Sequence, residues 1–231
     1  MKVLALDTTS LRGSVALREG DELLGLVYLA TNTDHSTTLL PAIDYLLAAS
    51  GLTVEEVGGI AVAAGPGSFS GIRIGLATAK GLAQARQRPL AGVSALHALA
   101  HRLRFLPGLI CPMVDALRGQ VYTTLYRSDG NEVEELAAPV AVAPADWLAT
   151  LPDAEVRFLG DGLRRHGGLI AAAGRTAWSM PSVVPFLADV IAEIGGRRLE
   201  RGEGDPVGAL DALYIRASDA EINQAARRAR E

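Results

Sequence analysis

The sequence lacks several features that would place the protein outside the cytoplasm or on a polyanion. It holds a single cysteine, Cys111, so no disulfide can form within the chain. No apolar run approaches the roughly 20 residues of a membrane-spanning helix, and the first residues lead straight into a strand pattern without a signal-peptide layout. The formal net charge of -4 argues against broad electrostatic attraction to nucleic acid or an anionic membrane. We therefore expect a cytoplasmic protein with no membrane contact and only an indirect relation to any RNA.

The length of 231 residues allows a sizeable core, in one large domain or two smaller ones. Hydrophobic patterning up to about residue 104 predicts three strands, then a helix, a strand, a helix, a strand and a helix, which is an α/β arrangement with a mixed sheet. Pro107–Gly108 is the predicted boundary between residues 1–106 and residues 107–231. Beyond it, the pattern predicts strands over 109–116, 118–127 and 155–159, a helix over 183–194 and a frayed helical tail over 219–231.

The turn Gly65-Pro66-Gly67-Ser68 follows an apolar strand and opens a helix. Ser68 or Ser70 can cap that helix, and the free N–H groups of its first turn would favour an anion. The sequence has neither G-x-x-x-x-G-K-[ST] nor G-x-G-x-x-G, the two common phosphate-binding patterns. An ordinary tight turn is therefore preferred to a phosphate site.

The helix that follows this turn carries small residues at every fourth position, Gly71, Gly75, Ala79 and Ala83, which lie along one face. Each interior glycine costs the helix about 1 kcal/mol relative to alanine. In return, the missing side chains allow the helix backbone to pack closely against a neighbouring element. The pattern alone favours packing against the protein's own sheet over packing against another chain.

Two further turns are candidates for binding phosphate. Asp7-Thr8-Thr9 follows the first strand, where it could meet a metal-bound phosphate or equally could cap local backbone N–H groups. Gly160-Asp161-Gly162 follows a later strand and is a second such turn or an ordinary one. The candidate nucleotide-binding residues are Asp7, Thr8, Thr9, Gly65, Gly67, Gly160, Asp161 and Gly162.

His97 and His101 are four residues apart and share a helix face, a spacing that is compatible with a metal. No H-E-x-x-H motif surrounds them, and their neighbours offer no further ligand. We therefore expect packed or surface histidines. His35, at a helix start, is expected to be a hydrogen-bonding turn residue.

Several motifs together resemble the bacterial TsaB (YeaZ) family: LALDTTSLRGSVAL, HSTTLLPAID, AAGPGSFSGIRIGLATAKGLA, VDALRGQVYTTLY, LGDG and LYIR. The resemblance covers nearly the whole chain and is strongest over residues 1–127. That family belongs to the pathway that places a threonylcarbamoyl group on adenosine 37 of tRNAs reading codons that begin with A.

The resemblance implies an α/β fold of two lobes, actin-like and sugar-kinase-like, with mixed sheets and flanking helices, related to the catalytic subunit TsaD. In that sister family a His-x3-His pair binds the metal used in carbamoyl transfer. The corresponding positions here are Ala95 and Leu99, and His97 and His101 point about 200° away from them on a helix. The resemblance therefore implies no metal, no cofactor and no catalytic residue in this chain.

The role implied is that of a non-catalytic partner, which pairs with TsaD through helices of its first lobe and helps recruit the ATPase TsaE. Relatives also form homodimers through the same helices, and contact with tRNA would be indirect. For the small-residue face of residues 71–83, the resemblance favours packing against another chain over packing against the protein's own sheet. The predicted interface residues are Leu39, Leu40, Ile43, Leu47, Gly71, Ile72, Gly75, Ala79 and Ala83. Two alternatives remain: a metal-dependent peptidase or transferase using His97 and His101, and an actin-like ATP-binding enzyme using the glycine-rich and Asp7 turns.

Overall fold

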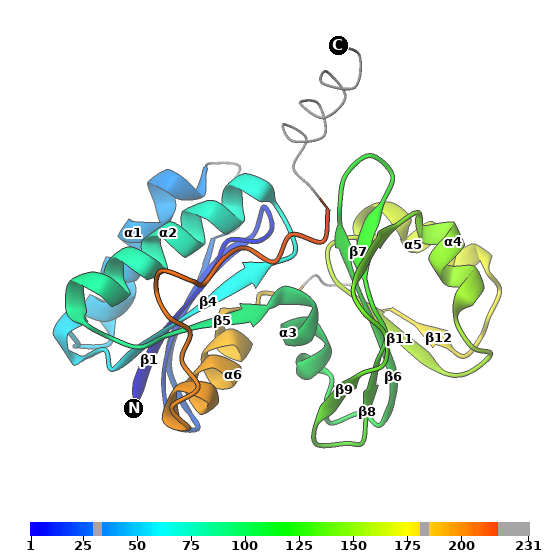
Figure 1. The fold of residues 1–231 in the computed structure, drawn as a ribbon. Helices are drawn as coiled ribbons and strands as arrows, with labels where there is room; N and C mark the ends of the chain where they lie inside the picture. The colour runs from blue at the N-terminus through cyan, green and yellow to red at the C-terminus, as the bar shows by residue number, and fades with distance from the viewer. Residues whose placement is uncertain (30–33, 181–184, 217–231) are drawn as a thin grey trace, which may run out of the picture.

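The computed structural model describes residues 1–29, 34–180 and 185–216. It contains a five-stranded sheet and a seven-stranded sheet, which lie side by side in two lobes (Figure 1). The predicted tail over 219–231 lies outside the described residues. No helix in the described ranges has the length and apolarity needed to cross a bilayer.

The first sheet has the strand order β3-β2-β1-β4-β5. Its strands are β1 (Lys2–Asp7), β2 (Gly13–Glu19), β3 (Glu22–Leu29), β4 (Gly59–Gly65) and β5 (Leu90–Ser94). β1, β2 and β3 pair antiparallel, whereas β4 is parallel to both β1 and β5. The mixed sheet predicted from the sequence is confirmed.

Helices cover both faces of the first sheet: α1 (His35–Ala49) and α2 (Phe69–Arg86) on one, α3 (Ala95–Arg102) and α6 (Ala188–Glu200) on the other. Successive side chains of a strand point to opposite faces. Leu4 and Leu6 of β1 accordingly join the core beneath α1 and α2, while Val3 and Ala5 join the core shared with α3 and α6. A short 3₁₀ turn, η1 (Val54–Glu56), precedes β4.

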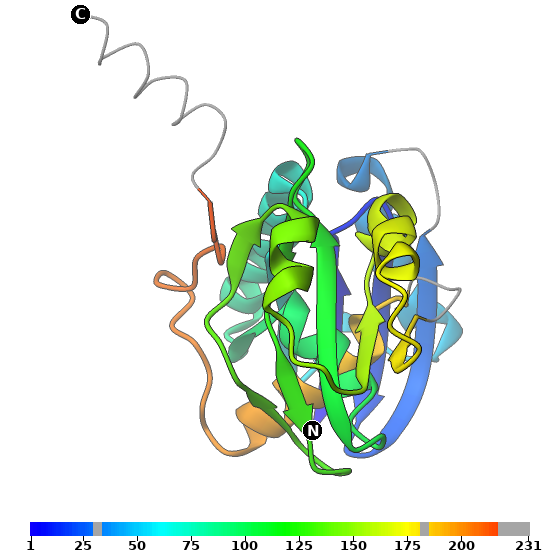
Figure 2. The ribbon, with the colours of Figure 1, turned by 90° about the vertical axis from the view of Figure 1, so that its right-hand side faces the viewer.

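The second sheet is built around β6 (Gly108–Asp115) and lies nearest the viewer in Figure 2. Its other elements are β7 (Val121–Thr123), β8 (Tyr126–Ser128), β9 (Val133–Glu135), β10 (Val140–Val142), α4 (Pro144–Thr150), β11 (Val156–Leu159), α5 (Leu163–Ala172) and β12 (Trp178–Ser179). The single strand predicted over 118–127 is instead two strands. β7 pairs with the end of β6 and β8 with its start, and Pro112, which has no N–H group for the ladder, lies opposite the break.

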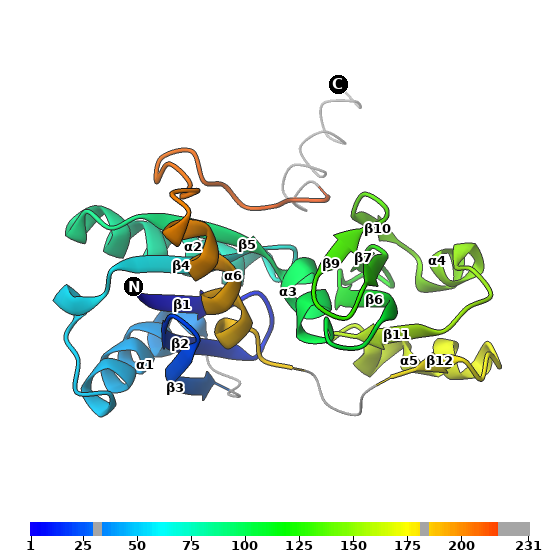
Figure 3. The ribbon, with the colours of Figure 1, turned by 90° about the horizontal axis from the view of Figure 1, so that it is seen from below.

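The helix predicted over 183–194 begins at Ala188 and runs on to Glu200 as α6; residues 183–184 lie outside the described ranges. α6 packs against the first sheet (Figure 3). A Cβ atom on Gly195 would lie only 2.5 Å from that of Ala61, so glycine permits this close packing. Residues 188–200 therefore lie with the first sheet, although the expected division at residue 107 put them in the second lobe. The segment that connects α3 to β6 does contain Pro107. The division into two domains stays a prediction.

Candidate functional site

A cavity of about 500 Å³ lies between the two lobes. The turns that follow β1, β4, β6 and β11 all reach it, because the ends of these strands point toward the same place (Figure 1). Its lining residues are Thr9, Ser10, Leu11, Gly67, Ser68, Phe69, Ser70, Asp115, Ala116, Leu117, Tyr122, Asp161, Tyr214 and Arg216. The three glycine-rich or acidic turns that the sequence marks as candidates thus meet in one cleft.

The side chains of the turn after β1 form hydrogen bonds within the turn and to the neighbouring helix α2. The Thr9 backbone N–H donates to Asp7 Oδ1 over 3.0 Å, and the Thr9 hydroxyl donates to the same oxygen over 2.7 Å. Thr8 donates its hydroxyl to the carbonyl of Gly71, at 2.7 Å. Burial raises the pKa of Asp7 and outweighs the two Thr9 hydrogen bonds, which lower it. The sequence allows two roles for Asp7, meeting a metal-bound phosphate and capping local backbone N–H groups. These contacts are those of capping.

At the turn between β4 and α2, backbone N–H groups also donate to protein oxygens. The Ser68 hydroxyl accepts from the N–H of Gly71 at 3.3 Å, which is the helix cap predicted for it. The Ser68 N–H donates to the carbonyl of Thr9 at 2.6 Å. A Cβ atom on Gly67 would lie 2.2 Å from that carbonyl oxygen, so this close approach requires glycine. The first turn of α2 is therefore fastened to the turn after β1.

The second lobe repeats this construction. Asp115 Oδ1 accepts from the N–H of Leu117 at 2.9 Å, just as Asp7 accepts from the residue two positions on. Asp161 Oδ1 accepts from the N–H of Asp115 at 3.0 Å. Gly160 has a φ of 119°, and a Cβ atom there would lie 2.1 Å from the carbonyl oxygen of Met113. In each lobe, the end of one strand or the turn after it is hydrogen-bonded to a neighbouring glycine-rich turn.

Three aspartates, Asp7, Asp115 and Asp161, lie at or just after strand ends around the cleft. Burial raises the pKa of Asp161, the Asp115 N–H lowers it, and the negative charges of Asp115 and Asp7 raise it further. The Asp115 carboxylate pairs with Arg165 at 3.3 Å. Within the described part of the chain, no group of three or more His, Cys, Asp or Glu side chains is placed to hold a metal ion. The negative charges of these aspartates disfavour an additional anion beside them.

His97 and His101 are not arranged around a common ligand position. His101 is buried, and its Nε2 atom lies 3.3 Å from Oε1 of Glu193 on α6. The His97 ring lies edge-on to Tyr126, with centroids 5.9 Å apart. Burial lowers the pKa of His97, and the neighbouring His101 lowers it further. Both are packed histidines, as the sequence leads us to expect, and His35 likewise bonds through Nε2 to the carbonyl of Ser10 at 2.7 Å.

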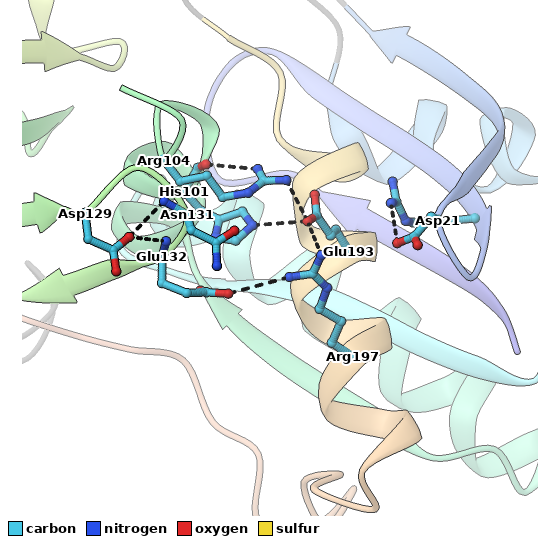
Figure 4. A network of polar contacts seen from close by, with 9 residues as sticks. Asp21, His101, Arg104, Asp129, Asn131, Glu132, Glu193 and Arg197 are labelled. Carbon is cyan, nitrogen blue, oxygen red and sulfur yellow. Dashed lines mark hydrogen bonds and ion pairs between the residues drawn. The ribbon is translucent and has the colours of Figure 1, made fainter. Parts of the chain in front are cut away.

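His101 belongs to a set of polar side chains that we call the interlobe network: His101, Arg104, Glu132, Glu193 and Arg197 (Figure 4). Glu193 Oε1 accepts from Arg104 at 2.8 Å and from Arg197 at 3.0 Å. Arg197 also reaches Glu132, in the turn between β8 and β9, at 3.8 Å. The network joins α6 on the first sheet to α3 and to the second sheet. Sequence reasoning missed it.

The small-residue face of α2 points inward. A Cβ atom on Gly71 would lie 2.0 Å from the carbonyl oxygen of Thr8, and one on Gly75 would lie 2.4 Å from the Thr8 hydroxyl. This is the packing against the protein's own sheet that the pattern alone favours. The other buried members of the predicted interface are Leu39, Ile43, Leu47, Ile72, Ala79 and Ala83.

Leu40 differs from the rest of the predicted interface set, because its side chain is 52% exposed. Tyr45, also on α1, is 67% exposed and was missed; an aromatic residue among the polar positions of α1 is the signal that could have found it. The interface stays a prediction. On α1 and α2 the large apolar residues that solvent reaches are Leu40, Tyr45 and Phe69, of which Phe69 stacks on Tyr214.

Comparison with known proteins finds relatives that are named for tRNA threonylcarbamoyladenosine biosynthesis. A family model described as TsaD, tRNA N6-adenosine threonylcarbamoyltransferase, matches residues 22–165. The tRNA threonylcarbamoyladenosine biosynthesis protein TsaB of Bacillus subtilis is 38% identical over 174 residues, which is 74% of this chain and 75% of that protein. The protein of the same name from Escherichia coli is 33% identical over 135 residues, 58% of each chain.

A solved structure is similar over almost its whole length. It is a crystal structure of an uncharacterized protein with similarity to peptidase YEAZ from Pseudomonas aeruginosa, with a TM-score of 0.80 and 28% sequence identity. The superposition covers 93% of this chain and 99% of the other. The expected fold class, a two-lobed α/β fold with mixed sheets and flanking helices, is confirmed.

Proposed function

Because the chain belongs to the TsaB (YeaZ) family, we propose that it acts in the biosynthesis of tRNA threonylcarbamoyladenosine as a non-catalytic partner subunit. In this role it binds and supports a TsaD-like catalytic subunit, helps recruit a TsaE-like ATPase, and pairs with a second copy of itself when alone. Its net charge of -4 suits an indirect relation to tRNA. It works in the cytoplasm and carries no metal or cofactor of its own.

The observation that carries the proposal is that N–H groups in three of the cleft's turns donate to protein oxygens. A cleft that acts on phosphate groups offers them free backbone N–H donors. Here the N–H groups of Thr9, Ser68 and Leu117 each donate to a protein oxygen. This supports a partner role over the ATP-binding alternative. Calorimetry with Mg-ATP on the isolated protein tests that alternative.

The peptidase-like alternative depends on His97 and His101. Glu193 lies within hydrogen-bonding distance of His101, and the two ring centroids are 6.1 Å apart. These contacts favour a packing role. Metal analysis that found stoichiometric zinc or iron lost on His97→Ala or His101→Ala would revive the alternative.

The proposed docking surface is the exposed side of α1, with Leu40 and Tyr45 as its apolar contacts. Gly75→Arg and Ile43→Asp are unsuitable tests, because both positions are buried and the substitutions would disrupt the lobe itself. Leu40→Asp combined with Tyr45→Asp leaves the core intact. Truncation of a few central apolar residues commonly removes most of an interface's affinity.

Binding of the double variant to a TsaD-like subunit, measured by calorimetry, is expected to weaken at least about tenfold. Leu169→Asp is the matched control, since Leu169 is 44% exposed on α5 of the second lobe. Full binding by the double variant would overturn the surface. The same variants, in sedimentation experiments on the isolated chain, test the homodimer.

Reconstituted tRNA threonylcarbamoylation, with and without this chain, tests the role as a whole. We expect product formation by the catalytic subunit and the ATPase to depend on the chain. Equal rates in its absence would overturn the partner role.

A further inference from the structure

The segment after α6 returns along the edge of the first sheet (Figure 1, orange to red). The N–H of Asp205 donates to the carbonyl of Leu90 at 2.7 Å, and the Asp205 carboxylate accepts from the N–H of Gly92 at 2.7 Å. Farther on, the N–H of Leu213 donates to the carbonyl of Ala64 at 2.7 Å. The segment therefore covers the edge strand β5 and ends beside the turn that opens α2.

Its last described residues then cross from one lobe to the other. The Tyr214 ring stacks on Phe69 with centroids 5.5 Å apart, and its hydroxyl accepts from Arg73 Nε at 3.0 Å, both partners belonging to α2. Arg216 lies two residues on. Its guanidinium donates to Gln120 Oε1 at 2.7 Å and to the carbonyl of Ala116 at 3.1 Å, both in the turn between β6 and β7 of the second lobe.

We propose that residues 213–216 are a latch, which bonds the two lobes together across the cleft and controls access to its cavity. Tyr214 and Arg216 both line that cavity, so the latch forms part of its wall. The lobes are also joined elsewhere, by α3 and by the interlobe network. The lobes are thus joined at one side by α3 and the interlobe network, and at the cleft by the latch. When the latch releases, the cleft widens.

The bonds of the latch suit release. Tyr214 is 42% exposed; its hydroxyl accepts a hydrogen bond from the Arg73 guanidinium and its ring stacks on Phe69. Arg216 donates to the side-chain oxygen of Gln120 and to the backbone carbonyl of Ala116. Hydrogen bonds that solvent reaches are weakened by competition with water, whereas Glu193, His101 and Arg104 of the interlobe network are largely buried. Opening therefore breaks the latch before it breaks the network.

The test uses the full chain with spin labels on Ser36→Cys in the first lobe and Arg164→Cys in the second, both exposed positions. Cys111 is buried and burial raises the pKa of its thiol to about 11, so it stays unlabelled. Labelled chain is diluted into unlabelled chain, so that any dimer holds one labelled copy. Arg216→Ala and Gln120→Ala break the latch from opposite sides, and Arg127→Ala, exposed on β8, is the control.

We expect both latch variants to broaden the distance distribution toward longer distances and to speed amide exchange in residues 116–120 at least about tenfold. The control is expected to match the parent chain in both measurements. If Gln120→Ala and Arg216→Ala keep parent far-UV spectra and also match the control, the latch is overturned. A partner subunit is absent from this experiment, so its failure is distinct from failure of the proposed function.

Discussion

Asp7 and Glu193 are both buried carboxylates, yet their surroundings are opposite in kind. Asp7 lies at the cleft, where it accepts hydrogen bonds from the neutral N–H and hydroxyl groups of Thr9. Glu193 lies in the interlobe network, between His101, Arg104 and Arg197. The pKa of Asp7 is raised by burial. Burial also raises the pKa of Glu193, but the hydrogen bond from His101 and the neighbouring positive charges lower it to about 2.

The charge of the partners, together with the depth of burial, sets the direction in which the pKa of a carboxylate shifts. The network holds an ionised group with cations, which is a strong and specific arrangement. The turn after β1 holds its carboxyl with neutral donors, which suffices to shape a turn. The Glu193 carboxylate is therefore held by charged partners, while the Asp7 carboxyl is held by the local geometry of its turn.

Removing the charge of Glu193 is the strongest way to break this contrast. Glu193→Gln leaves Arg104 and the buried His101 without an anion, and we expect a loss of about 3 kcal/mol in the free energy of unfolding. Urea denaturation at neutral pH measures it. Glu132→Gln is the control, because Glu132 is 62% exposed and 3.8 Å from Arg197; its loss should stay below about 1 kcal/mol. Equal losses in the two variants would contradict the central role of Glu193.

The pH dependence of stability separates the two carboxylates by sign. The pKa of Glu193 is lowered from 4.5 to about 2, so its stabilisation is complete above pH 4.5 and is lost as pH falls toward 2. The pKa of Asp7 is raised above 3.8, so its effect is favourable at low pH and is lost as pH rises through the raised value. Unfolding of the parent chain and Glu193→Gln, measured from pH 7 to pH 2, should converge at the acid end. A constant difference would count against the ion pairs.

Local patterns in the sequence predicted most of the first lobe. Hydrophobic patterning located β1 to β5, the Ser68 cap marked the start of α2, and the four-residue spacing of small side chains marked a face of close approach. Each of these signals lies within a few residues of its effect. Three of the four turns at the cleft, those after β1, β4 and β11, were marked as candidates, because glycine and aspartate after an apolar strand are local features; the turn after β6 was not.

Contacts between distant segments could not be predicted in the same way. The apolar stripe of α6 indicates a helix but not which sheet it covers. His101 and Glu193 are 92 positions apart, and Arg216 and Gln120 are 96 apart, so no spacing rule joins them. The inward face of α2 shows the same limit, since small residues predict close approach without naming the partner, here Thr8.

Thr9 offers a smaller test at the cleft. Thr9→Val keeps the shape of the side chain and removes the hydroxyl that donates to Asp7 at 2.7 Å. We expect a loss of about 1 kcal/mol at neutral pH, together with a further rise in the pKa of Asp7. The control is Thr37→Val, whose hydroxyl bonds at an exposed helix start and should matter less. A loss as large as that of Glu193→Gln would mean that the turn is held more strongly than its neutral bonds suggest.

The smallest expected effect, and one of opposite sign, belongs to Asp7→Asn. Because burial favours the uncharged form of Asp7, a neutral side chain of the same shape avoids the cost of desolvating a charge, while its carbonyl oxygen still accepts from the Thr9 N–H. The free energy of unfolding at pH 7 should therefore stay within about 1 kcal/mol of the parent value or exceed it. The fall in stability that Asp7 causes as pH rises through its raised pKa should disappear. If Asp7→Asn instead costs as much as Glu193→Gln, the cleft carboxylate is held by charge after all, and the contrast between the two sides of the molecule fails.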